Sequence, residues 1–113
     1  MIVRDARESV RDYIITTYNR YKIGTGGDST NPNAGDLDSP ISSLTAVTGS
    51  GASSESTVEW KFTVQGSSYI GNTIKEVGIF DSSGNMLLRV NYDGIGPLTS
   101  TDEIEFIIVM EVD

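Results

Sequence analysis

Hydrophobic and polar residues alternate along the second half of the chain with the period of β-strands. In residues 57–64, one face is entirely apolar, formed by Val58, Trp60, Phe62 and Val64. The intervening residues are polar, so the pattern predicts a half-buried antiparallel strand. Two further apolar runs flank the turn sequence Asp81-Ser-Ser-Gly84-Asn85, which predicts a β-hairpin over residues 73–92.

A final strand is predicted from about residue 101 to residue 112. Its inward face carries Ile104, Phe106, Ile108, Met110 and Val112. Its other face is half apolar, because Ile107 and Val109 lie between acidic residues. A strand that is apolar on both faces is central to a sheet or covered by another element. We expect the N-terminal helix to cover it.

That helix is predicted over residues 3–19 from apolar positions three and four residues apart. The stripe consists of Val3, Ala6, Val10, Tyr13, Ile14 and Thr17. About 16 residues form a marginal helix in isolation, so we expect the helix to be held by docking its stripe on the rest of the chain. A first strand then leads into the sharp turn Gly24-Thr-Gly-Gly27.

Residues 24–56 form a loop-rich segment with three apolar anchors, Ile41, Leu44 and Val47. Its last part, residues 48–56, is nearly featureless and predicts a mobile loop. The whole pattern predicts one α+β domain over residues 1–113. Its expected architecture is an N-terminal helix packed on an antiparallel β-sheet or small β-sandwich of about five to six strands.

Amino-acid composition and net charge then exclude several kinds of site and partner. The 113 residues include no cysteine and no histidine, which excludes disulfides, thiolate or imidazole metal sites and Ser-His or Cys-His catalysis. A net charge of −8 makes nucleic acid and anionic membrane poor partners. Two explanations of this acidic charge stay open: a saline environment, in which salt screens the repulsion, or a general contribution to solubility. No apolar run reaches 18 residues, and residues 1–15 do not resemble a secretory signal.

Two loops carry residues that could bind a ligand. Gly24–Gly27 could cradle a phosphate, but no helix is predicted after it, so a structural turn is the favoured interpretation. Asp28, Asn31, Asp36 and Asp38 carry oxygens that suit Ca²⁺. Their spacing does not match an EF-hand loop, so calcium is a weak candidate. No cofactor is expected.

Neither the carboxylates nor the aromatic residues indicate a catalytic site. Acidic residues flank the hairpin, at Glu76 and Asp81, and gather at the start of the last strand, at Asp102, Glu103 and Glu105. We expect Glu103 and Glu105 to be solvated on an outer face, and we expect that the protein is not an enzyme.

Four aromatic residues fall on faces expected to point inward: Trp60, Phe62, Phe80 and Phe106. Tyr69 and Tyr92, near loops, are the aromatic residues expected to be exposed.

The segments in order resemble small tail-fibre, collar or baseplate-associated proteins of tailed viruses of bacteria and archaea. The resemblance spans nearly the whole chain, and its most specific motif is Ile74-Lys-Glu-Val-Gly-Ile-Phe-Asp81 before the hairpin turn. The weaker motif Gly24-Thr-Gly26 follows the first helix. Within the specific motif, Gly78 leaves a gap on the strand face that a neighbouring group can approach. A generic β-hairpin is the alternative interpretation of the motif.

The resemblance implies a non-enzymatic structural protein of the virion, assembled in the host cytoplasm. Expected partners are other virion proteins and copies of the chain itself, in a trimer or ring, with no nucleic acid and no membrane. Interface candidates are the helix, residues 28–56 and the outer face of the last strand. The individual residues are Ile107, Val109, Ile41, Leu44 and Tyr69.

Two alternatives stay open. Fibre proteins usually continue into a long shaft, whereas this chain ends at Asp113 after its last strand, so a capsid decoration protein is one alternative. The other is a β-sandwich that binds surface glycans for host attachment, with Ca²⁺, through residues 28–38 and Tyr69.

Overall fold

A computed structural model describes residues 3–27, 34–51 and 56–112 of the chain. It has one N-terminal helix, α1 (Arg4–Thr17), and two antiparallel sheets, which confirms the predicted α+β class. The strands are β1 (Arg20–Gly24), β2 (Thr45–Ala46), β3 (Gly49–Ser50), β4 (Thr57–Gln65), β5 (Ile74–Phe80), β6 (Met86–Ile95) and β7 (Glu103–Glu111). A short 3-10 helix, η1 (Gly66–Ser68), follows β4.

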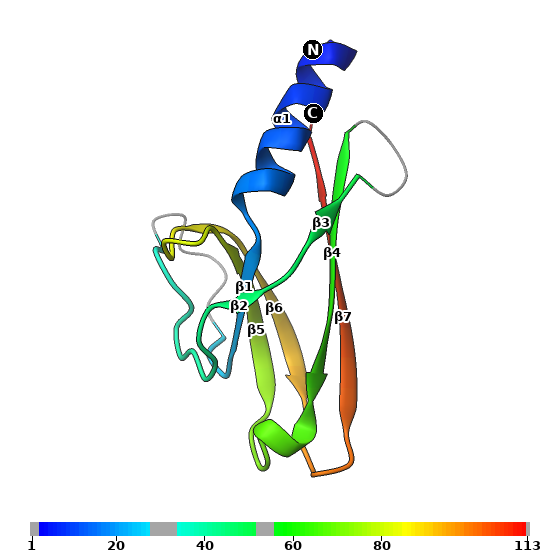
Figure 1. Cartoon of the computed structure of the whole chain (residues 1–113). Helices are drawn as coiled ribbons and strands as arrows, with labels where there is room; N and C mark the ends of the chain where they lie inside the picture. The colour runs from blue at the N-terminus through cyan, green and yellow to red at the C-terminus, as the bar shows by residue number, and fades with distance from the viewer. Residues whose placement is uncertain (1–2, 28–33, 52–55, 113) are drawn as a thin grey trace.

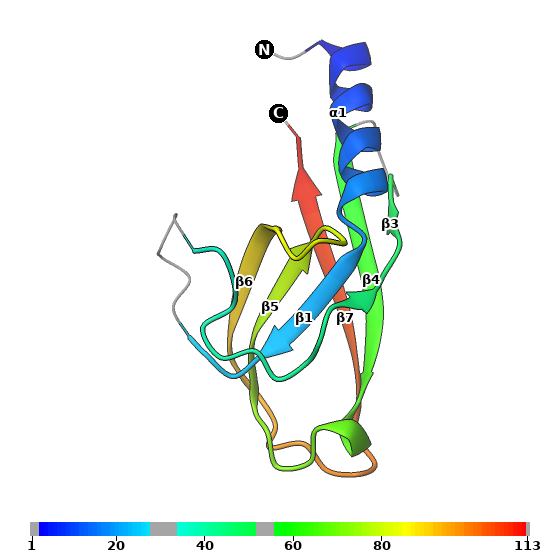
Figure 2. The same ribbon diagram turned by 60° about the vertical axis from the view of Figure 1, so that its left-hand side comes forward.

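The two sheets lie face to face, with α1 projecting from one end (Figures 1 and 2). One sheet has four strands in the order β2-β1-β5-β6, and the other has three in the order β3-β4-β7. Adjacent strands β5 and β6 form the predicted hairpin, whose turn contains Gly84 at a φ of 91°. That left-handed conformation is one that glycine adopts without steric cost.

The loop-rich segment contributes only short pairings. β2 and β3 are two residues each, and they add one edge to each sheet. Pro40 forms an isolated bridge with Gly24, so the chain after residue 36 runs beside β1. Residues 28–33 and 52–55 lie outside the described residues, and they include Asp28, Asn31 and much of the predicted mobile loop.

Apolar side chains from both sheets meet in one core. Tyr21 of β1 stacks on Phe62 of β4 with ring centroids 3.7 Å apart, and Phe62 lies 5.3 Å from Phe106 of β7. Tyr92 of β6 completes the row, 5.7 Å from Phe106. The expectation that Tyr92 and Tyr69 are exposed is wrong, because both rings are partly buried against this core. The aromatic row joins the two sheets.

The helix does not cover the last strand, which corrects the sequence-based expectation. α1 contacts β3 and β4, and Ile14 is its buried residue. On β7, Ile107 and Val109 remain 51% and 58% exposed. Only two residues separate α1 from β1, so the end of the helix is fixed beside the start of that strand. In Figure 2 it extends away from the sheets instead.

A second correction concerns Phe80. Its ring is fully buried, as predicted, but it lies outside the core between the sheets. Ile79 points into that core, so the next residue of the strand faces the opposite way. The face that carries Phe80 is the outer face of the four-stranded sheet, and the loop around Leu37 covers it.

Candidate interaction surfaces

Glu76 is a fully buried carboxylate at the centre of the four-stranded sheet. Its Oε2 atom accepts hydrogen bonds from the backbone N–H groups of Gly26 and Ser39, each at 2.8 Å. Its Oε1 atom accepts from the N–H of Asp38, also at 2.8 Å. Three charge-assisted hydrogen bonds offset the loss of hydration that burial imposes on the carboxylate.

Two glycines make room for this carboxylate. A Cβ atom on Gly24 would lie 2.5 Å from Glu76 Oε2 and 2.6 Å from the Ser39 carbonyl oxygen. A Cβ atom on Gly26 would lie 2.8 Å from the same Oε2 and would also collide with Asp38. The motif Gly24-Thr-Gly26 is therefore a structural turn around Glu76, as the sequence favoured.

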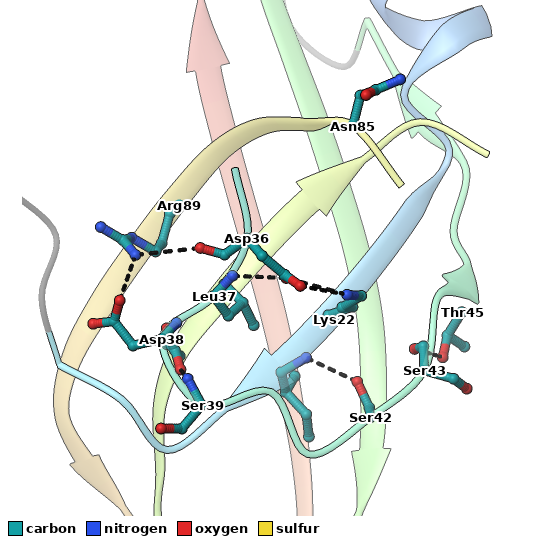
Figure 3. Close-up of polar contacts among 12 residues, drawn as sticks. Lys22, Asp36, Leu37, Asp38, Ser39, Ser42, Ser43, Thr45, Asn85 and Arg89 are labelled. Carbon is teal, nitrogen blue, oxygen red and sulfur yellow. Dashed lines mark hydrogen bonds and ion pairs between the residues drawn. The ribbon is translucent and has the colours of Figure 1, made fainter. Parts of the chain in front are cut away.

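The loop of residues 36–39 covers the outer face of the four-stranded sheet, and we call it the covering loop. Charged pairs hold it to the sheet (Figure 3). Lys22 on β1 donates to the Asp36 carboxylate at 3.1 Å, and its Nζ atom also lies 5.0 Å from the centre of the Phe80 ring. Arg89 on β6 donates to Asp38 Oδ1 at 3.1 Å. The arginine side chain is almost fully buried, so this ion pair is less screened by water than a surface pair.

Leu37, between these two acids, fills the gap predicted at Gly78. A Cβ atom on Gly78 would lie 3.0 Å from Leu37 Cδ2 and 2.7 Å from Phe80 Cε1. The group that approaches the glycine thus belongs to the same chain. Among the described residues, the motif of residues 74–81 serves internal packing.

Sequence reasoning missed the burial of Glu76. The available signal was an acid within the apolar run Ile74-Lys-Glu-Val-Gly-Ile-Phe80, since a strand buried on both faces tolerates a charge only with partners. The glycine turn of residues 24–27 could supply such N–H donors. The link between them spans 50 residues from Gly26 to Glu76, and no local pattern reveals it.

The other acidic candidates are placed differently. Asp36 and Asp38 are each engaged by a basic side chain, whereas Asp28 and Asn31 lie outside the described residues. Within the described ranges, no three acidic side chains gather in a way that could hold a metal ion. Glu103 and Glu105 are exposed on the outer face of β7, as the alternation predicted.

The five predicted interface residues divide into two groups. Ile41 and Tyr69 pack against the core with part of their surface exposed, and Leu44 is also partly buried. Ile107 and Val109 instead project from the outer face of β7, and we call this pair the β7 patch. The structure does not bring the two groups together into one continuous site.

Charges surround the β7 patch. On the neighbouring strand, Lys61 is paired in register with Ile107, and Glu59 with Val109. Glu103, Glu105 and Glu111 extend along β7 on the same face. Four acids and one lysine thus give this face a net charge of −3, the sum of −4 and +1. This arrangement would fit a partner surface that is apolar at its centre and carries basic groups around it.

No family model, curated protein or solved structure matches this chain. In the part of the chain that the structure describes, no helix combines the length and the apolar character required to cross a bilayer.

Proposed function

We propose that the protein is a non-enzymatic structural component of a tailed-virus virion. It assembles by protein–protein contacts in the tail, collar, baseplate or fibre. The observation that carries the proposal is the β7 patch, where two large apolar side chains are more than half exposed on a nine-residue strand. Such side chains at the middle of a paired strand favour burial against a partner.

The resemblance of residues 74–81 to tail-associated proteins supplies the biological setting of the proposal. The conformation of Glu76 and Gly78 supports an architectural role for that motif, since both residues serve internal contacts. The net charge of −3 around the patch favours another virion protein with a basic rim over a second copy of the same face.

The glycan-binding alternative depended on residues 28–38 and Tyr69. Asp36 and Asp38 are paired with Lys22 and Arg89, and Tyr69 packs against the core. No specific observation on the described residues favours a sugar site. We therefore retain the assembly function.

The test is to purify virus particles from the source culture and to probe them with an antibody raised against the recombinant chain. We expect the protein in the particles and, after dissociation, in the tail fraction. Recovery in the capsid fraction would favour a decoration protein instead. Absence from purified particles would contradict the virion proposal.

Cross-linking of the same particles tests the β7 patch. Lys61 lies beside the patch, whereas Lys75 lies on the other sheet and provides an internal control. An amine-reactive reagent should join Lys61 to a different virion protein more often than Lys75. Equal cross-linking of the two lysines would contradict a partner at the patch.

A further inference from the structure

Helix α1 presents an exposed apolar stripe with heptad spacing. The stripe begins at its N-cap residue, Val3, and continues with Ala6, Val10 and Tyr13, so the steps are three, four and three residues. Val3, Val10 and Tyr13 are 65%, 41% and 63% exposed, and Ala6 is exposed as well. The same spacing occurs at the a and d positions of coiled coils, the surface through which helices pack on helices. We call these four residues the α1 seam.

The body of the protein supports only the C-terminal end of the apolar stripe, so the expectation that the whole stripe docks on the rest of the chain is wrong. Ile14 is buried, and the end of the helix is held where Trp60 Nε1 donates to the Tyr18 carbonyl oxygen at 2.9 Å. A helix of 14 residues is marginal in water without tertiary packing. The seam therefore offers the apolar surface whose burial would stabilise the first turns.

The charge of the helix favours a second copy of the chain as the partner. The helix carries three arginines and three acids, so its net charge is zero in a chain of net charge −8. The three arginines are Arg4, Arg7 and Arg11, and the three acids are Asp5, Glu8 and Asp12. Two copies that approach through α1 avoid the like-charge repulsion that the β7 face would impose. The helix is thus better suited than the β7 face to contact between identical chains.

We propose that the α1 seam binds the α1 seam of a second copy of this chain in a symmetric helical contact. The contact deepens the proposed assembly function and rests on it for its biological setting. Its chemistry is independent of that setting, because heptad spacing and neutral charge are properties of the helix itself. The self-contact leaves the β7 patch, on another element, available to a different protein.

The small size of the α1 seam determines how strongly two chains are expected to associate. A helix of 14 residues is about 21 Å long, and such a contact is smaller than a standard protein interface. Free chains should therefore associate weakly and reversibly. The mass of the full chain should rise with concentration across roughly 1 µM to 1 mM, the range of weak protein association.

Sedimentation of the full chain tests the proposal with two matched variants. Val10→Asp places a charge in the centre of the seam, and Ser100→Asp adds the same charge at an exposed position in the connection between β6 and β7. We expect Val10→Asp to weaken self-association at least about ten-fold, because a charge buried in an apolar contact is costly. Ser100→Asp should associate like the natural chain.

Thermal unfolding of both variants at low concentration checks that they remain folded, which is expected because both sites are exposed. Hydrogen exchange of the natural chain provides a second measurement, in which residues 7–13 should gain protection as concentration rises. A natural chain that stays monomeric throughout would overturn the proposal. Equal association of the two variants, whether retained or lost, would also overturn it.

These outcomes are separate from those of the virion test. A monomeric chain found in purified particles would contradict the self-contact and leave the virion function standing. A seam-dependent oligomer absent from particles would contradict the virion function and leave the self-contact standing.

Discussion

At the scale of single residues, Glu76 connects three parts of the chain. Its carboxylate receives N–H groups from Gly26, Asp38 and Ser39, so it fixes both the glycine turn and the covering loop on β5. The negative charge is favourable here because all three neighbours are donors. A neutral side chain of the same size would not replace it.

We predict that Glu76→Gln lowers the free energy of unfolding by about 2–4 kcal/mol, because the amide N–H₂ would replace one acceptor oxygen and face a backbone N–H donor that then has no acceptor. Urea unfolding followed by circular dichroism measures this change. Glu105→Gln, at an exposed site on β7, is the matched control and should change stability by less than about 0.5 kcal/mol. Equal effects of the two substitutions would contradict the structural role of Glu76.

At the scale of elements, the β5–β6 hairpin depends on the Asp81 turn. Asp81 accepts from the side chain and the backbone N–H of Asn85, each at 2.9 Å, and from the N–H of Ser83. These hydrogen bonds favour the charged form, so they lower the pKa of Asp81 below its ordinary value of 3.8, with the Asn85 side chain as the largest cause.

The lowered pKa has a defined consequence for pH dependence. In the folded chain the carboxylate resists protonation, so its stabilisation of the turn is present above the ordinary pKa. It is lost as the pH falls below 3.8 and through the folded pKa. An NMR titration of the Asp81 carboxyl group should show Asn85→Ala raising its pKa toward 3.8. Ser82→Ala, in the same exposed turn, should leave it unchanged.

Most regular elements could be predicted because their patterns are local. Residues 57–64 alternate strictly and form β4, and the last predicted strand contains β7. The helix was also predicted, whereas its position was not. Its direction depends on β1, which joins the four-stranded sheet two residues after the helix ends. Helical periodicity identifies a face and does not specify what the face meets.

At the scale of the whole molecule, the aromatic row joins the two sheets. Tyr21 and Tyr92 come from the four-stranded sheet, and Phe62 and Phe106 come from the other. Burial raises the pKa of both tyrosines above 10.0. For Tyr21, repulsion from Tyr69 adds to burial, and a hydrogen bond with Thr45 opposes it.

Alkaline pH should therefore weaken the packing of the sheets. The folded state holds both phenols neutral, so their contribution is fully present below pH 10 and is lost as the pH rises through their folded pKa values. We expect the urea midpoint to fall above about pH 10. The double variant Tyr21→Phe, Tyr92→Phe should lose less stability over this range. An identical alkaline decline would contradict this assignment.

The sequence by itself determined the α+β class, the inward faces of β4 and β7, the structural nature of the glycine turn and the charge of −8. These features follow from neighbouring residues or from composition. Only the tertiary structure decided that Glu76 is a buried acceptor, that Phe80 packs outside the core and that the α1 seam and the β7 patch are exposed. Each of these depends on which distant segments meet. The donors to Glu76 lie 37 to 50 residues away, beyond the range of any local pattern.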